Sequence, residues 1–511
     1  MKEAFAIELK GITKTFGSVI ANKDVNLQVK QGEILAILGE NGSGKTTLMN
    51  MVSGIYFPDE GQIFVNGEEV VIRSPKDAFK YKIGMIHQHF KLVDVFTATE
   101  NIVLGIKDNK KFNIKAAKSR VKEITEKYGF VIDLDKKVYE MSVSEKQTVE
   151  IIKVLYRGAD ILILDEPTAV LTPQETERLF NVLRRMRKDG KSIIIITHKL
   201  HEVLEISDRV TTLRKGEYVG TVNTSEATEQ SLTEMMVGEK VTLNIKRNDP
   251  KNLKEVLTVK NLSVKGAEDK LILDDVNFTA YSGEILGIAG ISGCGQKELL
   301  ESIAGLQKTI QGSSIIYSPE DTELKELVGK SPREIRKLGV ALSFVPEDRL
   351  GMGLVGNMDI IDNMMLRSYK KGASAFLDRK DPKSLAERII ESLDVVTPNA
   401  STPVRRLSGG NVQKVLVGRE IALNPKVLMV AYPVRGLDIN SSYTIYNLLN
   451  KQKESGVAVI FVGEDLDVLI ELCDRIMVMN SGKITGIVDG RTAVKEELGL
   501  LMTKSTEKEE H

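Results

Sequence analysis

The chain has 511 residues, of which 42% are hydrophobic, and its 71 basic and 71 acidic side chains give zero formal net charge. The length allows about three or four domains with large cores, and the balanced charge argues against a non-specific nucleic-acid binder, which carries a strong basic field. The two cysteines, Cys294 and Cys473, are too few for a disulfide scaffold or a four-cysteine zinc site, which favours a reducing, cytosolic compartment.

The sequence is expected to contain neither a secretory leader nor a membrane span. The residues after Met1 alternate in polarity like a strand and do not form an apolar leader. The longest apolar runs, such as 161–164 and 193–196, fall far short of the ~18–20 residues that cross a bilayer.

The predicted elements occur in the same order twice along the chain. Each half begins with an alternating segment and continues with a short buried strand, a glycine-rich turn and a helix. A long, mostly helical middle follows, near 97–157 and 360–423, and then two more apolar strands and a hairpin signal. Strands that alternate with helices predict an α/β layer with a parallel sheet.

The sequence itself repeats, which predicts two homologous domains. Three segments recur about half a chain later: 25–54 as 276–305, 159–172 as 425–438, and 192–210 as 458–476. The repeat and the polar stretch around Pro250 predict a first domain at 5–240, a linker at 241–255, a second domain at 256–495 and a flexible tail at 496–511.

A glycine-rich loop follows the predicted strand at 34–38 and precedes a helix. Its residues are Gly39, Glu40, Asn41, Gly42, Ser43, Gly44, Lys45 and Thr46. Glycines let successive backbone N–H groups point at phosphate oxygens, and the helix N-terminus adds partial positive charge. Lys45 is expected to reach the β- and γ-phosphates, and Thr46 to bind Mg²⁺. The alternative is a purely structural glycine turn, which the strand–loop–helix context disfavours.

Two carboxylates, Asp165 and Glu166, follow the predicted apolar strand at 161–164. Asp165 suits the shell of a Mg²⁺ ion, and Glu166 suits the polarisation of an attacking water molecule. For such a pair alone, a helix cap or a solvated turn is the alternative. The phosphate-binding loop upstream favours the catalytic interpretation.

Three further side chains are candidates for the same site. His198 ends the predicted strand at 193–197, where it is expected to sense a phosphate, with an ordinary strand-end histidine as the alternative. Gln88 follows another strand, and its amide could contact Mg²⁺ or the lytic water. Phe16 is expected to stack on adenine, with a core aromatic as the alternative.

The second half contains another pattern that can bind an anion. Ser408, Gly409, Gly410 and Asn411 precede a helical run. A Ser-Gly-Gly turn at the start of a helix presents unpaired backbone N–H groups to an anion. By itself, the pattern is also consistent with a plain helix cap.

Together these residues resemble the ATP-binding cassette (ABC) ATPases, over about residues 5–490. The resemblance implies an α/β fold with two tandem P-loop NTPase cassettes, each with a RecA-like α/β core, an N-terminal antiparallel β subdomain and a helical subdomain. It implies that Glu166, His198 and Gln88 are catalytic and that Thr46, Gln88 and Asp165 bind Mg²⁺. The implied nucleotide contacts are Phe16, Gly39, Glu40, Asn41, Gly42, Ser43, Gly44, Lys45, Thr46, Thr47, Ser408, Gly409, Gly410 and Asn411.

The two copies depart from the family pattern in different places. In the loop of the second copy, Gln296 and Lys297 occupy the positions of Lys45 and Thr46. After the strand, Ala431 and Tyr432 replace Asp165 and Glu166. Glu464 occupies the position of His198, and Glu347 occupies that of Gln88. In the first copy the signature is altered, with Ser144 in place of a family glycine. Family cassettes pair head to tail, each site joining one loop to the other signature. The losses therefore imply one hydrolytic site and one catalytically dead site. Nucleotide binding at the dead site stays open, because Lys297 keeps a cation nearby but Ala431 leaves Mg²⁺ without its carboxylate.

Two fused cassettes resemble the ATPase subunit of bacterial sugar and nucleoside importers, and segments 84–105 and 165–175 most resemble the nucleoside-uptake branch. The resemblance implies ATP and Mg²⁺ as cofactors and a peripheral location on the cytoplasmic face of the cell membrane. The implied partners are two membrane permeases and, indirectly, an extracytoplasmic solute-binding lipoprotein, without nucleic acid. The alternatives are a ribose- or galactose-type importer, a soluble tandem cassette that acts on ribosomes or DNA, and a regulatory nucleotide-binding protein.

Overall fold

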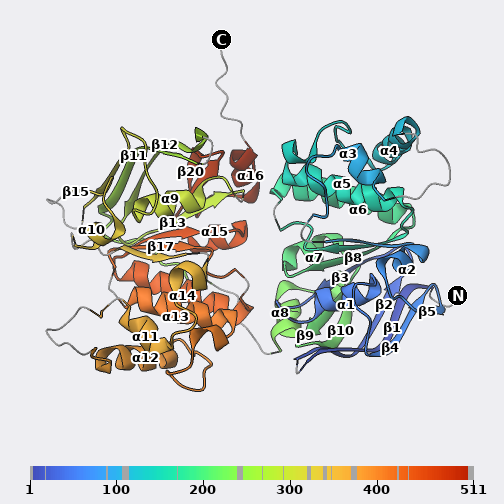
Figure 1. Cartoon of the computed structure of the whole chain (residues 1–511), viewed down its shortest axis with the longest axis horizontal. Coiled ribbons are helices and arrows are strands. Elements are labelled where there is room, and N and C mark those ends of the chain that lie inside the picture. Colours follow the sequence, from blue (N-terminus) through green and yellow to red (C-terminus); the bar gives the residue numbers. More distant parts are fainter. Residues whose placement is uncertain are drawn as a thin grey trace, which may run out of the picture. The chain divides into compact units, whose positions relative to one another are not determined.

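The computed structural model divides the chain into two units, Met1–Thr242 and Leu243–His511, coloured blue to green and green to red in Figure 1. The residues that the structure describes are 4–17, 19–87, 90–105, 114–169, 171–238, 245–266, 269–291, 293–318, 324–337, 342–346, 348–366, 368–369, 377–422, 425–435 and 437–503. Within these ranges, every helix is too short or too polar to cross a membrane.

An antiparallel sheet forms the first layer of the first unit. Its strands, in the order β2-β1-β4-β5, are β2 (Val19–Lys30), β1 (Phe5–Phe16), β4 (Glu60–Val65) and β5 (Glu68–Val70). Apolar residues alternate along β1, and Ile7, Leu9 and Ile12 point into the core, where they are at most 1% exposed. One face of this sheet is therefore buried, as the alternation predicts.

A six-stranded sheet forms the second layer and carries the site. Its order is β10 (Glu217–Asn223), β9 (Arg209–Arg214), β3 (Ile34–Leu38), β8 (Ser192–Thr197), β7 (Ile161–Asp165) and β6 (Ile83–Ile86). All of these strands run parallel except β10, which forms a hairpin with β9. Every residue of β3, β7 and β8 is buried. Helices cover one face of the sheet, and the antiparallel sheet together with the helix at 45–52 packs against the other.

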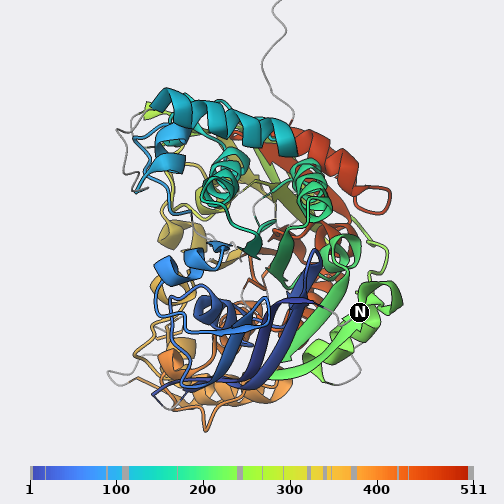
Figure 2. The same cartoon turned by 90° about the vertical axis from the view of Figure 1, so that its right-hand side faces the viewer.

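The helices of the first unit fall into two groups. Those connected to the parallel sheet are α1 (Lys45–Val52), α2 (Pro75–Lys80), α6 (Pro173–Lys188), α7 (Leu200–Ile206) and α8 (Glu229–Val237). The helical part comprises α3 (Ala98–Val103), α4 (Ile114–Tyr128) and α5 (Val143–Tyr156), which share a small core of their own. In Figure 2 these helices (blue to teal) lie at one end of the unit and the antiparallel strands (dark blue) at the other.

The second unit repeats this plan. Its antiparallel sheet has the order β12 (Leu271–Tyr281), β11 (Glu255–Lys265), β14 (Ser314–Tyr317) and β15 (Lys325–Glu326). Its six-stranded sheet has the order β16 (Leu342–Val345), β17 (Val427–Ala431), β18 (Ala458–Val462), β13 (Ile285–Gly290), β19 (Arg475–Asn480) and β20 (Lys483–Asp489). Its α-helices are α9 (Gln296–Ile303), α10 (Pro332–Lys337), α11 (Ile360–Met365), α12 (Lys380–Ser392), α13 (Gly409–Ile421), α14 (Ile439–Glu454), α15 (Leu466–Leu472) and α16 (Lys495–Thr503). The predicted pair of α/β domains is confirmed.

The predicted linker at 241–255 is too long at its C-terminal side. Ile245 is 7% exposed and belongs to the core of the second unit. Arg247 donates hydrogen bonds to the carbonyl oxygens of Ile470, at 2.8 Å, and of Cys473. The segment from Ile245 onward is therefore part of the second unit, because buried apolar and backbone contacts fix a stretch whose composition is that of a linker.

The predicted flexible tail at 496–511 also begins too early. Helix α16 continues to Thr503, and its side chains Leu498 and Met502 are 0% and 8% exposed in the core of the second unit. Leu498 and Met502 are four residues apart, so they lie on one face of the helix. The remaining tail residues, 504–511, lie outside the described residues.

Candidate active site

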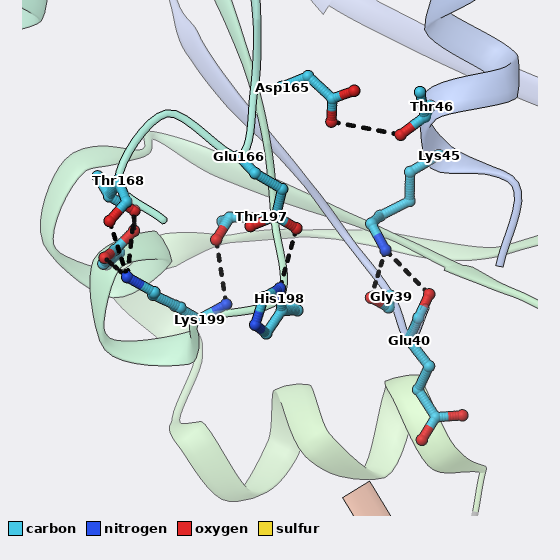
Figure 3. Close-up of polar contacts among 11 residues, drawn as sticks. Gly39, Glu40, Lys45, Thr46, Asp165, Glu166, Thr168, Thr197, His198 and Lys199 are labelled. Carbon is cyan, nitrogen blue, oxygen red and sulfur yellow. Dashed lines mark hydrogen bonds and ion pairs between the residues drawn. The ribbon is translucent and has the colours of Figure 1, made fainter. Parts of the chain in front are cut away.

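Three segments far apart in the sequence meet at the carboxyl edge of the parallel sheet of the first unit (Figure 3). Strand β3 leads into the glycine-rich loop and α1, β7 ends at Asp165, and β8 ends at Thr197. Leu38 pairs with Thr197, and Asp165 pairs with Ile196. Because parallel strands present their carboxyl ends at the same edge, the predicted loop, carboxylates and histidine are brought together.

Two glycines of the loop cannot carry a side chain. A Cβ atom at Gly39 would lie 2.3 Å from the carbonyl oxygen of Leu213. Gly44 has φ 93°, and a Cβ atom there would lie 2.4 Å from the carbonyl oxygen of Ala21. The backbone therefore passes close to its neighbours and opens its N–H groups at the start of α1, the arrangement that a phosphate requires.

Lys45 is held at the loop with its ammonium group against the backbone. The residue is 6% exposed, and its Nζ atom donates hydrogen bonds to the carbonyl oxygens of Gly39, at 2.6 Å, and Glu40, at 2.9 Å. Burial lowers the pKa of Lys45, whereas the charges of Glu166, Asp165 and Glu40 oppose this shift. The ammonium group uses two of its three N–H donors on the loop backbone, which leaves one for an anion that enters the loop.

Thr46 and Asp165 place two oxygen atoms side by side. The Thr46 hydroxyl donates to Oδ1 of Asp165 at 3.3 Å, and Asp165 is 6% exposed. Burial raises the pKa of Asp165, and the Thr46 hydrogen bond opposes this. A hydroxyl next to a buried carboxylate is a hard oxygen donor pair, which suits Mg²⁺.

Glu166 and His198 form the polar pair on the other side of the site. Glu166 has φ 48°, a left-handed conformation, and its N–H donates to the carbonyl oxygen of Ile196 at 2.9 Å. Its Oε1 atom lies 2.9 Å from Nδ1 of His198. Burial lowers the pKa of His198, but the hydrogen bond and the charge of Glu166 outweigh it, and the pKa is raised.

Two buried polar atoms at this site have no hydrogen-bond partner among the described residues. They are the Oγ atom of Ser43 and the Oε2 atom of Glu166. Buried polar groups are usually paired, so a polar ligand at either atom would complete its hydrogen bonding. A phosphate next to Ser43 and a water molecule next to Glu166 would satisfy both, which fits the nucleotide and the lytic water that the sequence predicts.

The other residues of the first copy that are predicted to contact the nucleotide make fewer contacts with the rest of the chain. Phe16, at the end of β1, is 43% exposed and contacts Tyr56 edge to face, with ring centroids 5.2 Å apart. Its ring is therefore not part of the core. Asn41 and Gly42 are exposed, and Thr47 lies within α1. Gln88, and its counterpart Glu347, lie outside the described residues.

The second unit keeps the backbone of the site without its chemical groups. Gly295 has φ 99° before α9, and Gln296 donates from Nε2 to the carbonyl oxygen of Ile291 at 3.1 Å. Tyr432 has φ 49°, and its N–H donates to the carbonyl oxygen of Val462 at 2.9 Å, as Glu166 does to Ile196. The amide of Gln296 thus replaces one loop contact of Lys45, but it supplies no charge.

The two signature segments begin their helices differently. Ser408 caps α13, where Nδ2 of Asn411 donates to its Oγ atom at 2.9 Å, and both Ser408 and Gly409 are exposed. In the first unit, Ser142 and Glu145 form a capping box at α5, and Lys136 pairs with Glu145 at 2.8 Å. The N-terminus of α5 already holds a carboxylate, whereas that of α13 does not, so α13 is the better site for an anion.

Sequence reasoning missed three polar residues that contact one another beside Glu166 and His198, namely Thr168, Lys199 and Glu202. Thr168 begins the turn at 168–171 that matches the family pattern, but no motif marks Lys199 or Glu202. Alignment of the two copies does give a signal, because the equivalent positions in the second copy are Val434, Asp465 and Val468. Two of the three positions are therefore apolar in the second copy, and the third carries the opposite charge, so this set of polar contacts is specific to the first copy.

The α/β core and the phosphate-binding loop define a P-loop nucleotide hydrolase. A family model described as ABC transporter matches residues 22–169 and 273–433. The nucleoside import ATP-binding protein NupA of Lactococcus lactis subsp. cremoris is 42% identical over 98% of this chain and 99% of its own length. The chain belongs to the ABC transporter family, as a tandem-cassette ATPase.

Two further relatives are similar over almost their whole length. The guanosine import ATP-binding protein NupO of Bacillus subtilis is 42% identical over 99% of this chain and 98% of its own. The ribose import ATP-binding protein RbsA of Caldanaerobacter subterraneus subsp. tengcongensis is 37% identical over 97% of this chain and 98% of its own. The two-cassette organisation is thus shared with all three proteins along the full chain.

Proposed function

We propose that this chain is the ATP-hydrolysing subunit of a bacterial importer that takes up nucleosides through separate membrane permeases. The observation that carries the proposal is the 42% identity to two proteins named for nucleoside or guanosine import. A ribose-type importer is the second candidate, because a ribose import protein is 37% identical. In both cases the chain would bind permeases at the cytoplasmic face of the membrane, with a solute-binding lipoprotein as an indirect partner.

In the proposed mechanism, the first cassette supplies the groups that act on ATP. The backbone N–H groups between Gly39 and Gly44 bind the phosphates, and the Lys45 ammonium group offsets their charge. Glu166 accepts a hydrogen bond from the attacking water through the buried Oε2 atom that has no partner among the described residues. His198 orients Glu166 through their 2.9 Å contact. Phe16 offers its exposed ring to the adenine base.

The proposed Mg²⁺ ligands are Thr46 and Asp165, together with Gln88. The 3.3 Å contact between Thr46 and Asp165 supports this assignment, because both oxygens can face one cation. When bound, the ion would reduce the negative charge of the β- and γ-phosphates.

We further infer that only one of the two nucleotide sites hydrolyses ATP. The intact loop would be completed by the signature residues Ser408, Gly409, Gly410 and Asn411 of the second cassette. Support comes from the distribution of the losses, since the second cassette lacks the cation at Gln296 and both carboxylates at Ala431 and Tyr432. Lys297 keeps a cation near the degenerate loop, with its half-exposed side chain 3.9 Å from Glu301, but Ala431 leaves Mg²⁺ without its carboxylate.

The substrate is tested by uptake in a strain that lacks the gene for this chain. We expect uptake of labelled nucleosides to fall in the deletion strain and to return when the wild-type chain is supplied, while uptake of labelled ribose stays unchanged. A strain supplied with a Lys45→Met variant serves as the matched control for ATP dependence. Loss of ribose uptake with normal nucleoside uptake would contradict the nucleoside assignment and favour the second candidate.

A further inference from the structure

A buried polar cluster joins the turn after β7 to helix α7 in the first unit (Figure 3). We call Thr168, Lys199 and Glu202 the 168–199–202 cluster. Nζ of Lys199 donates to the carbonyl oxygen of Thr168 at 3.1 Å and to Oε1 of Glu202 at 3.0 Å. The Thr168 hydroxyl donates to Oε2 of Glu202 at 2.5 Å. Thr168 and Glu202 are 1% and 4% exposed, so water competes little for the contact between them, whereas the Lys199 side chain is 23% exposed.

The cluster lies directly beside the pair that the proposed mechanism uses. Glu166 is two residues before Thr168 on one segment, and His198 immediately precedes Lys199 on the other. On the strand side, the Glu166 N–H donates to the carbonyl oxygen of Ile196 at 2.9 Å. The two segments are therefore joined before and after the Glu166–His198 contact. This arrangement fixes the backbone positions from which the two side chains extend.

The second unit shows that the fold does not require this cluster. Val434 and Val468 occupy the positions of Thr168 and Glu202, and both pack against the core of that unit. Asp465, at the position of Lys199, accepts instead from the N–H of Asp467 at 2.9 Å. Removing the Glu202 carboxylate from water is costly, and the apolar residues at the positions of Thr168 and Glu202 in the second unit avoid that cost. A need for stability alone therefore does not explain the polar set.

We propose that Thr168, Lys199 and Glu202 are positioning residues that hold Glu166 and His198 at the separation that ATP hydrolysis requires. The inference rests on the proposed catalytic role of Glu166. The cluster touches neither nucleotide nor water in this assignment, and it acts only through the two turns that it joins. This role explains why the 168–199–202 cluster occurs in the cassette that has both carboxylates and is absent from the cassette that lacks them.

The test is steady-state ATP hydrolysis by the full chain with the double substitution Thr168→Val and Glu202→Val, which introduces the side chains of the second unit. We expect kcat to fall about tenfold, since small displacements of reacting groups are costly. The KM for ATP is expected to stay at the wild-type value. The melting temperature is expected to fall because Lys199 loses its carboxylate partner, so kcat is compared at a temperature at which both proteins are folded. Thr168→Ser keeps the hydroxyl and is expected to retain wild-type kcat, and Val434→Thr is the matched control in the second unit.

The single substitution Thr168→Val, which removes only the hydroxyl, is expected to lower kcat in the same direction by less. The inference is overturned if the folded double variant hydrolyses ATP at the wild-type rate, or if KM rises while kcat holds. It is also overturned if Thr168→Ser is as slow as the double variant. If the wild-type chain itself shows no hydrolysis, or if Glu166→Gln hydrolyses normally, the proposed function fails first. The two failures are therefore distinguishable.

Discussion

Among single residues, Glu166 carries the most specific prediction. Substitution by Gln keeps the shape of the side chain and the left-handed backbone but removes the acceptor for a proton from water. We expect Glu166→Gln to lower steady-state ATP hydrolysis at least about a hundredfold and to leave ATP binding intact, as measured by phosphate release and by nucleotide titration. Tyr432→Phe, at the equivalent backbone position, is the control. Unchanged hydrolysis in Glu166→Gln would exclude Glu166 as the base.

The pKa of His198 provides a second residue-scale prediction. Burial lowers this pKa, as do the charges of Lys199 and Lys45, but the hydrogen bond and charge of Glu166 raise it above the ordinary histidine value. The ion pair therefore contributes stability at pH values below the ordinary pKa of histidine, and this contribution is lost as the pH rises through the raised pKa.

Removal of the Glu166 charge reverses the balance at His198. In Glu166→Gln, the carboxylate charge that raises the pKa of His198 is absent, while burial and the two lysines still lower it. We therefore expect the pKa of His198 to fall. The measurement is an NMR titration of histidine ring signals, with the His198 signal assigned from a His198→Gln variant among the five histidines. An unchanged pKa in Glu166→Gln would show that the 2.9 Å contact is not formed in solution.

The elements of the core could be predicted from sequence because their signals are local. The strands β3, β7 and β8 are short apolar runs, and the turns that bound them are rich in glycine or charge. The glycine-rich loop is likewise continuous in sequence. The 168–199–202 cluster could not be predicted in this way, because Thr168 and Glu202 are brought together only by the pairing of β7 with β8.

Helix α16 shows why the predicted tail was wrong, and it gives an element-scale prediction. Leu498, Gly499 and Met502 are buried, but this short apolar run stands between Glu496 and Glu497 on one side and the charge-rich segment 504–511 on the other, so the predicted boundary fell too early. Leu498 is 0% exposed, and we expect Leu498→Ala to lower the free energy of unfolding of the second unit by about 2–5 kcal/mol.

Leu500, two residues further along α16, supplies the matched control. Its side chain is 62% exposed, so the same truncation is expected to change the free energy of unfolding by at most about 0.5 kcal/mol. Urea unfolding followed by circular dichroism measures both variants in the full chain. Equal effects of Leu498→Ala and Leu500→Ala would mean that α16 does not dock on the second unit.

At the scale of the whole molecule, one backbone plan serves two chemically different cassettes. Tyr432 keeps the left-handed conformation of Glu166, although such a conformation is unfavourable for a bulky side chain. The backbone hydrogen bond to Val462 and the sheet register impose it. The second cassette therefore keeps the backbone conformation although it lacks the carboxylate of Glu166 and the cation of Lys45. Neither group is needed for folding.

The same substitution at equivalent loop positions tests this asymmetry. Lys45→Met removes a buried ammonium group from the first cassette, and we expect ATP hydrolysis to fall at least about a hundredfold because the charge that offsets the phosphates is lost. Gln296→Met removes one hydrogen bond to the carbonyl oxygen of Ile291 and no charge, so kcat is expected to stay at the wild-type value. The measurement is phosphate release by each variant at saturating ATP, with melting temperatures equal to that of the wild type as the check on folding. A comparable loss in both variants would mean that the second loop also takes part in hydrolysis, and the single-site assignment would be wrong.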